Sequence, residues 1–155
     1  MIKPPNDIVS VLLKASKAYS VPYSILQSVA YHESRYNPNA VSPVGAKGLM
    51  QIMPVNYETY GITDPFDPIQ SANAGAKMLS NLKNRFGNWS QALAAYNWGI
   101  GNVTKKPNKE QWPQSTQKYV ASIIKMSGVE KAKEGFISFI IGVVFAYTLK
   151  RFLLK

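Results

Sequence analysis

The chain of 155 residues carries 18 basic and 8 acidic side chains, a formal net charge of +10, and no cysteine. This length favours one globular domain with a buried core, and the lack of cysteine excludes disulfides, thiol chemistry and cysteine–zinc sites. The positive charge favours a polyanionic partner such as nucleic acid, anionic lipid or an anionic cell-wall polymer, with a solvated lysine face as the equally weighted alternative.

Helix signals begin near the N-terminus. Asn6 or Asp7 can cap a first helix that carries apolar residues at helical spacing. Ser20 can cap a second helix, which the sequence predicts to run to about Tyr36. Residues 37–47 are rich in Pro, Asn, Ser and Gly, and this composition predicts a loop.

The spacing of apolar residues predicts four further helices, at residues 54–60, 69–86, 91–97 and 115–126. Ser90 and Ser115 are candidate caps, and the candidate stops are glycines, namely Gly87, Gly99, Gly101 and Gly128. No strand pattern of useful length is present. The predicted fold class is therefore all-α with about seven helices, divided into a domain at residues 1–128 and a tail at residues 129–155.

The tail has the composition of a membrane segment. Residues 136–149 are fourteen uncharged and mostly apolar residues. A spanning helix needs about 20 residues, and residues 136–154 give 19 if Lys150 and Arg151 extend their charged ends to the interface. We therefore expect residues 129–155 to form a C-terminal hydrophobic helix that anchors the chain through residues 136–154. A buried terminal helix and an interfacial helix are the alternatives.

One acid stands apart from the other seven. Six of these occupy caps, turns or lysine-rich polar segments, and Glu58 lies in a short predicted helix with no special setting. Glu33 follows Val29 by four residues and Ile25 by eight, at the edge of the apolar stripe of the second predicted helix. Half burial there would raise the pKa of its carboxyl and keep it protonated near neutral pH, as a general acid requires. The alternative is an edge glutamate in a salt bridge with Arg35 or a surface lysine.

Four blocks carry a resemblance to a known family. Residues 33–38 read Glu-Ser-Arg-Tyr-Asn-Pro, which resembles the Glu-Ser-x-aromatic-x-Pro signature of the soluble lytic transglycosylases, whose fold is goose-lysozyme-like. Residues 48–54 resemble the family's Gly-Leu-Met-Gln-x-x-Pro block, residues 94–99 its Ala-Tyr-Asn-Ala-Gly block, and residues 119–120 its late Tyr-Val pair. Together they cover residues 21–124. Trp98 stands where the family usually has alanine, and packing in the core is its preferred interpretation.

The resemblance implies a lysozyme-like helical domain and an activity. It implies cleavage of the β-1,4 bond between N-acetylmuramic acid and N-acetylglucosamine, with formation of a 1,6-anhydro sugar. Glu33 would act first as acid and then as base, and Tyr119 would hydrogen-bond it. The implied substrate-binding residues come from the same blocks and are Ser34, Met50, Gln51, Tyr96 and Asn97.

Other residues have simpler interpretations. Gly45 and Gly48 flank a loop expected to approach the substrate closely, and Tyr36 is expected in the core. His32 is the only histidine and lies about 100° around the helix from Glu33, so neither a shared catalytic role nor a metal centre is expected. No cofactor is implied. The expected partners are peptidoglycan glycan strands and a membrane, without nucleic acid.

Three functional alternatives remain open at this stage. A muramidase that uses water would need a second acid, for which Asp64 and Asp67 are the candidates. A wall-binding membrane protein without activity, or a transglycosylase of a conjugation or secretion system at the bacterial inner membrane facing the periplasm, is also compatible. Residues 1–7 show no apolar signal-peptide stretch. We therefore favour a phage virion with an internal membrane, where the enzyme opens the wall for genome entry, with virion or secretion-complex proteins as possible partners.

Overall fold

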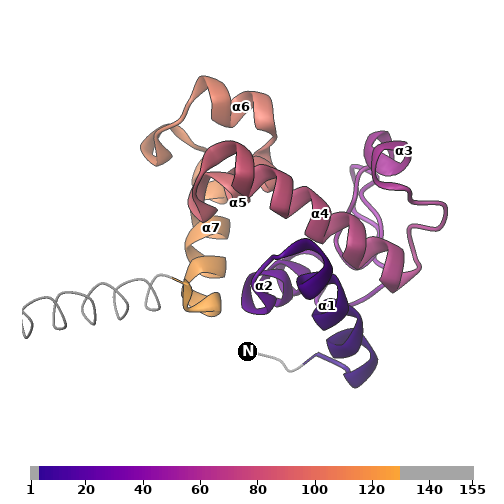
Figure 1. Ribbon diagram of the computed structural model, residues 1–155. Coiled ribbons are helices and arrows are strands. Elements are labelled where there is room, and N and C mark those ends of the chain that lie inside the picture. The colour runs from indigo at the N-terminus through magenta and orange to yellow at the C-terminus, as the bar shows by residue number, and fades with distance from the viewer. Residues whose placement is uncertain (1–3, 130–155) are drawn as a thin grey trace, which may run out of the picture.

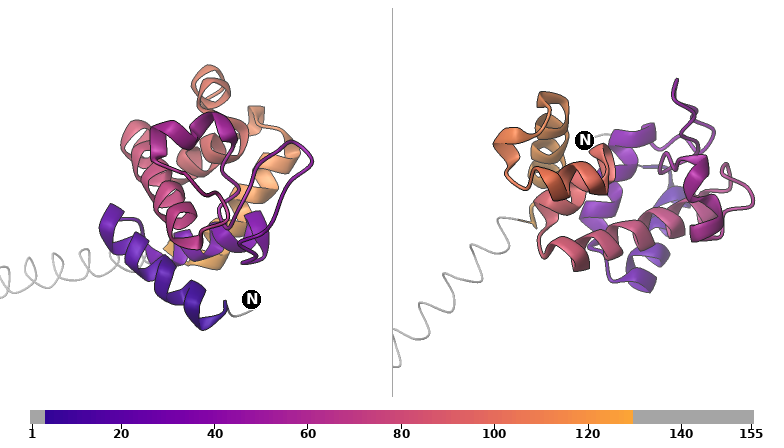
Figure 2. Two further views of the ribbon diagram at one scale, coloured as in Figure 1. Left: turned by 90° about the vertical axis from the view of Figure 1, so that its right-hand side faces the viewer. Right: turned by 90° about the horizontal axis from the view of Figure 1, so that it is seen from above.

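The computed structural model describes residues 4–129, which form a helical domain (Figure 1 and, in two further views, Figure 2). Within these residues the helices are α1 (Asn6–Tyr19), α2 (Tyr23–Ser34), α3 (Tyr57–Tyr60), α4 (Pro68–Phe86), α5 (Trp89–Trp98), α6 (Ile100–Lys105) and α7 (Gln114–Ser127). Two 3-10 turns, η1 (Pro54–Asn56) and η2 (Lys109–Gln111), precede α3 and α7. The prediction of a mostly helical fold is confirmed.

Most of the predicted tail helix lies outside the described residues, which end at Val129. Between residues 4 and 129, no helix combines the length and the apolar character that crossing a bilayer would require. The predicted spanning segment at residues 136–154 therefore stays a prediction from the sequence.

Prolines, rather than the predicted polar residues, precede three of the helices. Pro5, Pro22 and Pro113 occupy the N-cap positions of α1, α2 and α7, where the proline ring fixes φ near the value that the helix continues. The predicted caps at Asn6 or Asp7, at Ser20 and at Ser115 are wrong. Ser20 instead ends α1 in the left-handed region, with a φ of 53°.

The helix starts and stops around α5 also differ in part from the prediction. Asn88, not Ser90, caps α5, because its side chain accepts a hydrogen bond from the backbone N–H of Gln91. Gly87 ends α4 as predicted. Gly101 does not end a helix but lies inside α6, which the sequence did not predict, and Gly99 makes the bend between α5 and α6 with a φ of 99°.

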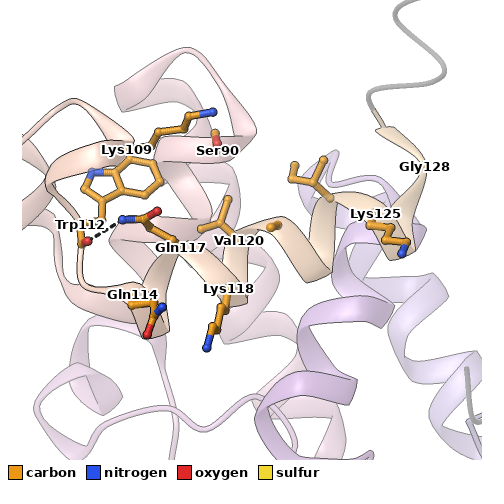
Figure 3. A pocket seen from close by; sticks show the side chains of 11 residues that line it. Ser90, Lys109, Trp112, Gln114, Gln117, Lys118, Val120, Lys125 and Gly128 are labelled. Carbon is orange, nitrogen blue, oxygen red and sulfur yellow. Dashed lines mark hydrogen bonds between the residues drawn. The ribbon is translucent and has the colours of Figure 1, made fainter.

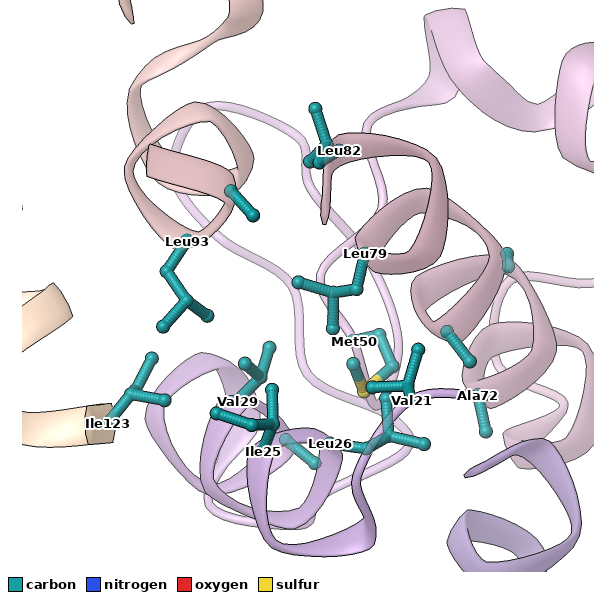
Figure 4. Close-up of a cluster of buried hydrophobic side chains, with 14 of the residues drawn as sticks. Val21, Ile25, Leu26, Val29, Met50, Ala72, Leu79, Leu82, Leu93 and Ile123 are labelled. Atoms are coloured by element: carbon teal, nitrogen blue, oxygen red, sulfur yellow. The ribbon is translucent and has the colours of Figure 1, made fainter. Parts of the chain in front are cut away.

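The core gathers around α2, which packs on α1 and α7. Its buried residues face two groups of neighbours (Figure 4). Ile25 and Val29 point toward Leu93 of α5 and Ile123 of α7, whereas Leu26 lies with the buried side chains from α4 and from the 35–53 loop. The C-terminal end of α2, which carries Glu33, is thereby held against α7.

The loop between α2 and η1, residues 35–53, is fixed by backbone contacts to its neighbours. The N–H of Met50 donates to the Ser71 hydroxyl of α4 at 3.0 Å, and the N–H of Gly48 donates to the carbonyl of Ala40 at 2.9 Å. Gly48 has a φ of +80°, and a Cβ built on it would lie 2.0 Å from the carbonyl oxygen of Pro65. The predicted close approach at Gly48 is therefore one between two backbone segments of the protein itself.

Gly48 and Gly45 form a matched pair for a stability test. Gly45 also has a positive φ, +90°, but a Cβ there would meet nothing within 4 Å. Gly45→Ala should lower the free energy of unfolding by about 1 kcal/mol, the cost of a left-handed alanine. Gly48→Ala should lower it by at least about 3 kcal/mol, because backbone must also move. Urea denaturation measures both values, and equal losses would contradict the close contact with Pro65.

Candidate active site

The candidate site is built on the packing of α2 against α7. Glu33 lies in the last turn of α2 and is half-buried. The hydroxyl of Tyr119, on α7, donates a hydrogen bond of 2.6 Å to Oε1 of Glu33 across this interface. The structure thus brings together two predicted residues that are 86 positions apart in the chain.

Burial dominates the electrostatics of Glu33. Loss of solvent raises the pKa of its carboxyl from 4.5 to about 7, while the hydrogen bond from Tyr119 acts in the opposite direction because it favours the charged form. Among residues 4–129, no cationic side chain contributes to this pKa. Arg35 instead stacks on the Tyr31 ring at 4.2 Å and donates to the Tyr31 carbonyl at 3.2 Å. The alternative of a salt bridge between Glu33 and Arg35 is wrong.

The hydrogen bond also suggests where the proton of Glu33 lies. Tyr119 remains a donor at neutral pH, because burial and the nearby charge of Glu33 raise the pKa of its phenol well above the usual value. Oε1 of Glu33 is therefore occupied as an acceptor, which leaves Oε2 as the atom that carries the acidic proton. Such a carboxyl can give and take a proton near neutral pH.

Tyr96, near the C-terminal end of α5, borders the same site. Burial raises the pKa of its phenol well above the usual value, and the charges of Glu33 and Tyr60 raise it further. Its hydroxyl donates to the carbonyl of Met50 at 2.8 Å. Tyr96 therefore connects α5 to the 35–53 loop beside Glu33.

Three predicted substrate-binding residues are engaged mainly in holding the 35–53 loop. The buried Ser34 hydroxyl donates to the carbonyl of Leu49 at 2.8 Å. Met50 is fully buried, with its side chain packed where a Cβ on Gly75 would clash, so it has no exposed surface for a sugar ring to contact. Gln51 has a positive φ of 49°, and its Nε2 donates to two backbone carbonyls of the same loop.

Asn97 is the one predicted site residue that is exposed. It follows Tyr96 at the end of α5, and its Oδ1 accepts a hydrogen bond of 3.0 Å from the hydroxyl of Thr116 on α7. This bond orients the amide and leaves the Nδ2 group as a donor toward solvent. Thr116, which is buried, was missed from the sequence, although it lies one helical turn before Tyr119 and so shares its face of α7.

His32 contacts α7 beside Tyr119. Its Nε2 lies 2.9 Å from the Ser122 hydroxyl and 3.3 Å from the sulfur of Met126, both on α7. Its ring also meets the Tyr119 ring edge-on, with 5.7 Å between centroids. Burial and the positive charge of Arg35 lower the pKa of the imidazole, which favours its neutral form. Sequence spacing placed His32 on a different side of the helix from Glu33, but did not reveal its contact with Tyr119.

The two candidates for a second acid are both used to shape the turn before α4. Oδ1 of Asp64 accepts from the N–H of Phe66 at 2.9 Å. Asp67 caps α4, since its Oδ1 accepts from the N–H of Ile69 at 2.8 Å. Among the residues that the structure describes, no group of three or more His, Asp or Glu side chains could hold a metal ion.

Two core assignments can be stated from the same region. Tyr36 is buried in the hydrophobic core, as predicted. Trp98 is half-buried and packs against the core, with the Nζ of Lys106 over its ring at 6.0 Å. Packing is therefore at least part of the role of Trp98.

Comparison with known proteins places the chain in a family. A family model of the transglycosylase SLT domain matches residues 10–119. The chain is 34% identical over 111 residues to a transglycosylase of Enterobacteria phage PRD1, covering 72% of this chain and 39% of that protein. It is 40% identical over 94 residues to the membrane-bound lytic murein transglycosylase F of Shewanella sediminis, covering 56% and 19%. The chain thus spans about two fifths or less of the length of these relatives.

Solved structures show the same fold. The chain superposes on an inactive mutant of the lytic transglycosylase Slt from Pseudomonas aeruginosa with a TM-score of 0.69 and 26% identity, covering 81% of this chain and 24% of that one. The 70-kDa soluble lytic transglycosylase of Escherichia coli gives a TM-score of 0.66 and 28% identity over the same shares. The predicted lysozyme-like helical domain is confirmed.

The raised pKa of Glu33 should be visible in stability. Between pH 4.5 and about 7 the folded chain holds a proton that the unfolded chain has lost, so stability falls as pH rises through this range. Because glutamine does not ionise, Glu33→Gln removes this pH-dependent fall in the free energy of unfolding. We expect the variant to match the native chain near pH 4 and to exceed it by about 2 to 3 kcal/mol near pH 8.

Denaturant unfolding at a series of pH values measures this difference. Glu58→Gln, which makes the same change at an exposed position, is the control. A Glu33→Gln effect that is the same at all pH values would mean that the pKa of Glu33 is not raised.

Proposed function

The chain belongs to the transglycosylase SLT family, and from this premise we propose that it is a peptidoglycan lytic transglycosylase. Its substrate would be the β-1,4 bond between N-acetylmuramic acid and N-acetylglucosamine. The observation that carries the proposal is the half-buried Glu33, whose pKa of about 7 and hydrogen bond from Tyr119 suit a single residue that both donates and accepts a proton.

In the first step Glu33 acts as the acid. Its Oε2 gives a proton to the glycosidic oxygen, the bond from that oxygen to C1 of the muramic acid breaks, and the N-acetylglucosamine leaves with a free 4-hydroxyl. The positive charge that develops at C1 is stabilised by the oxygen of the substrate's own N-acetyl group, so a second protein carboxylate is not needed.

In the second step the same residue acts as the base. Glu33, now a carboxylate, takes the proton of the C6 hydroxyl while that oxygen forms a bond to C1. The product is a 1,6-anhydro sugar, no water is consumed, and Glu33 is protonated again. Tyr119 donates to Oε1 in both steps and so keeps Oε2 directed at the reacting oxygens.

The remaining predicted residues divide into two roles in this proposal. Asn97 offers its Nδ2 group to the sugar, and its exposure supports contact with substrate. Gln51 offers only its Oε1 as an acceptor, because its Nε2 donates to two carbonyls of the 35–53 loop. The other three residues shape the side of the candidate site and do not contact the sugar, because their hydroxyl groups or side chains are engaged within the protein. They are Ser34, Met50 and Tyr96.

Two alternatives find less support. A water-using muramidase needs a carboxylate to activate the water, and Asp64 and Asp67 are occupied by hydrogen bonds from their own turn. An inactive wall-binding protein would have no need for a buried acid with a raised pKa, which lowers stability near neutral pH.

We further propose that residues 136–154 anchor the enzyme in the internal membrane of a phage virion, where it opens the wall locally during genome entry. The apolar run in the sequence supports an anchor, and the similarity to a phage transglycosylase supports a virion. A transglycosylase of a conjugation or secretion system is the second candidate, and the similarity to membrane-bound murein transglycosylases of bacteria supports a cellular enzyme rather than a virion enzyme.

The activity can be tested on purified bacterial sacculi. Mass analysis of the released muropeptides should find the 1,6-anhydro product, which is one water lighter than the product of hydrolysis. Glu33→Gln should reduce the rate by at least about 10²-fold, the usual contribution of a general acid–base residue. Glu58→Gln, at an exposed position, should leave the rate unchanged. A hydrated product from the native chain would favour a muramidase, and full activity of Glu33→Gln would remove Glu33 from the mechanism.

The anchor can be tested by truncation. A chain that ends at Gly128 keeps every buried residue of the core and loses only Val129 of the residues packed against it. It should remain in the aqueous phase without detergent. The full chain should partition into detergent or vesicles, because burying residues 136–154 in hydrocarbon is favourable. Equal aqueous solubility of the two chains would rule out the anchor.

A further inference from the structure

A groove of about 880 Å³ lies along α7 and is separate from the Glu33 site (Figure 3). Its apolar part includes Val120, Ala121 and Ile124 of α7. The segment after η2 forms another wall, where Trp112 is fixed by a hydrogen bond from its Nε1 to the carbonyl of Lys106 at 2.9 Å. The groove is therefore a shaped, partly apolar surface with a rigid side.

The charged residues of the groove are all positive. Lys109, Lys118 and Lys125 line it and are exposed, and none of its lining residues is acidic. An apolar strip beside three lysines, with no carboxylate among them, complements an anionic and amphiphilic surface. Anionic phospholipid has this chemistry, with phosphates for the lysines and the glycerol and upper acyl region for the strip.

The groove and the Glu33 site lie on opposite faces of α7. Each residue of a helix turns by about 100°, so Gln117, Ala121 and Ile124 lie about 140° to 160° around the axis from Tyr119. These three residues line the groove, whereas Tyr119 contacts Glu33 on α2. A surface that covers the groove therefore leaves the Glu33 site directed away from it.

The end of the groove is also the point from which the chain continues to the apolar segment. Gly128, which ends α7, lines the groove. The eight residues from Gly128 to Phe136 can span at most about 29 Å. The intervening sequence, residues 129–135, holds two lysines and two glutamates and so has no net charge. An anchor that begins at Phe136 would keep the groove close to the membrane surface.

We propose that this groove docks on anionic lipid headgroups beside the anchor, and that docking orients the catalytic domain with Glu33 facing the wall. This inference rests on the anchor proposed above. The three lysines bind lipid phosphates, and the apolar strip enters the interface. The occupant is a lipid surface because the groove lies at the chain's connection to the apolar segment and opposite the site for glycan.

A single fluorescent label can test docking, because the chain has no cysteine of its own. Ala121→Cys places a label in the groove at an exposed position. Val55→Cys, at a residue that is 83% exposed in η1, is the control at the α3 end of the domain, away from α7 (Figure 1). The labelled full chains are reconstituted into vesicles of neutral lipid, with or without phosphatidylglycerol, that carry nitroxide on a fraction of the headgroups.

We expect strong quenching of the label at position 121 in the phosphatidylglycerol vesicles, weaker quenching in neutral vesicles or high salt, and little at position 55 throughout. Flotation of the vesicles reports the anchor separately. A chain that does not float overturns both the anchor and the docking. A chain that floats with no quenching at position 121 overturns the docking alone.

Charge reversal provides the second measurement. Lys118→Glu with Lys125→Glu changes two lysines of the groove, and Lys14→Glu with Lys17→Glu changes two exposed lysines of α1 by the same amount. Each lysine lost from the groove should lower the ratio of docked to undocked chain at least about fivefold, while the α1 pair should leave it unchanged. If the groove pair instead weakens binding to purified sacculi and spares the quenching, the partner is a wall polymer and the lipid assignment is wrong.

Both pairs should retain the activity of the native chain on soluble glycan strands, because none of the four lysines belongs to the Glu33 site. Equal losses of quenching in the two pairs would show that net charge alone, and not the groove, controls the approach to the membrane. That result would also overturn the docking.

Discussion

The carboxyl of Glu33, held out of water where α2 meets α7, is the constraint on which the rest of the structure depends. Burial of an acid is unfavourable in its charged form, and here burial outweighs the hydrogen bond from Tyr119, so the pKa stays near 7. The packing that achieves this involves the apolar residues of α2 as a whole, with Ile25 and Val29 against α5 and α7. In our proposal the core therefore serves the chemistry as well as stability, since loosening the α2–α7 contact would admit water to Glu33.

The polar side chains around Glu33 have two different roles: some hold the 35–53 loop, and one stays exposed. The 35–53 loop is fixed by side-chain donors that bond its backbone carbonyls. These donors belong to Ser34, Gln51 and Tyr96. Asn97 receives its orientation from Thr116 and stays exposed. A site of this kind is preorganised, because its walls are already held by internal hydrogen bonds.

The sequence could predict the helices and the pairing of Glu33 with Tyr119, because apolar spacing reports helix faces and the motif resemblance links distant blocks. It could not predict that Pro5, Pro22 and Pro113 stand at the N-cap positions, because the polar residues nearby are equally compatible with capping and these three helices start without a side-chain cap. Nor could it predict α6, where Gly101 is tolerated inside a helix. The internal roles of Ser34 and Met50 depend on which atoms meet across the 35–53 loop, and spacing along the chain carries no such information.

In our proposal one helix, α7, serves both the chemistry and the orientation of the enzyme. The face of α7 that bears Tyr119 completes the acid–base site, and the opposite face bears the lysine-lined groove. Because α7 is rigidly packed on α2 and α5, the direction of the groove fixes the direction of Glu33. In our proposal the anchor holds the domain at the membrane, and the docked groove defines which way the site faces. If the substrate is a wall parallel to the membrane, as we propose, the contact at the groove determines how often the site meets a glycan strand.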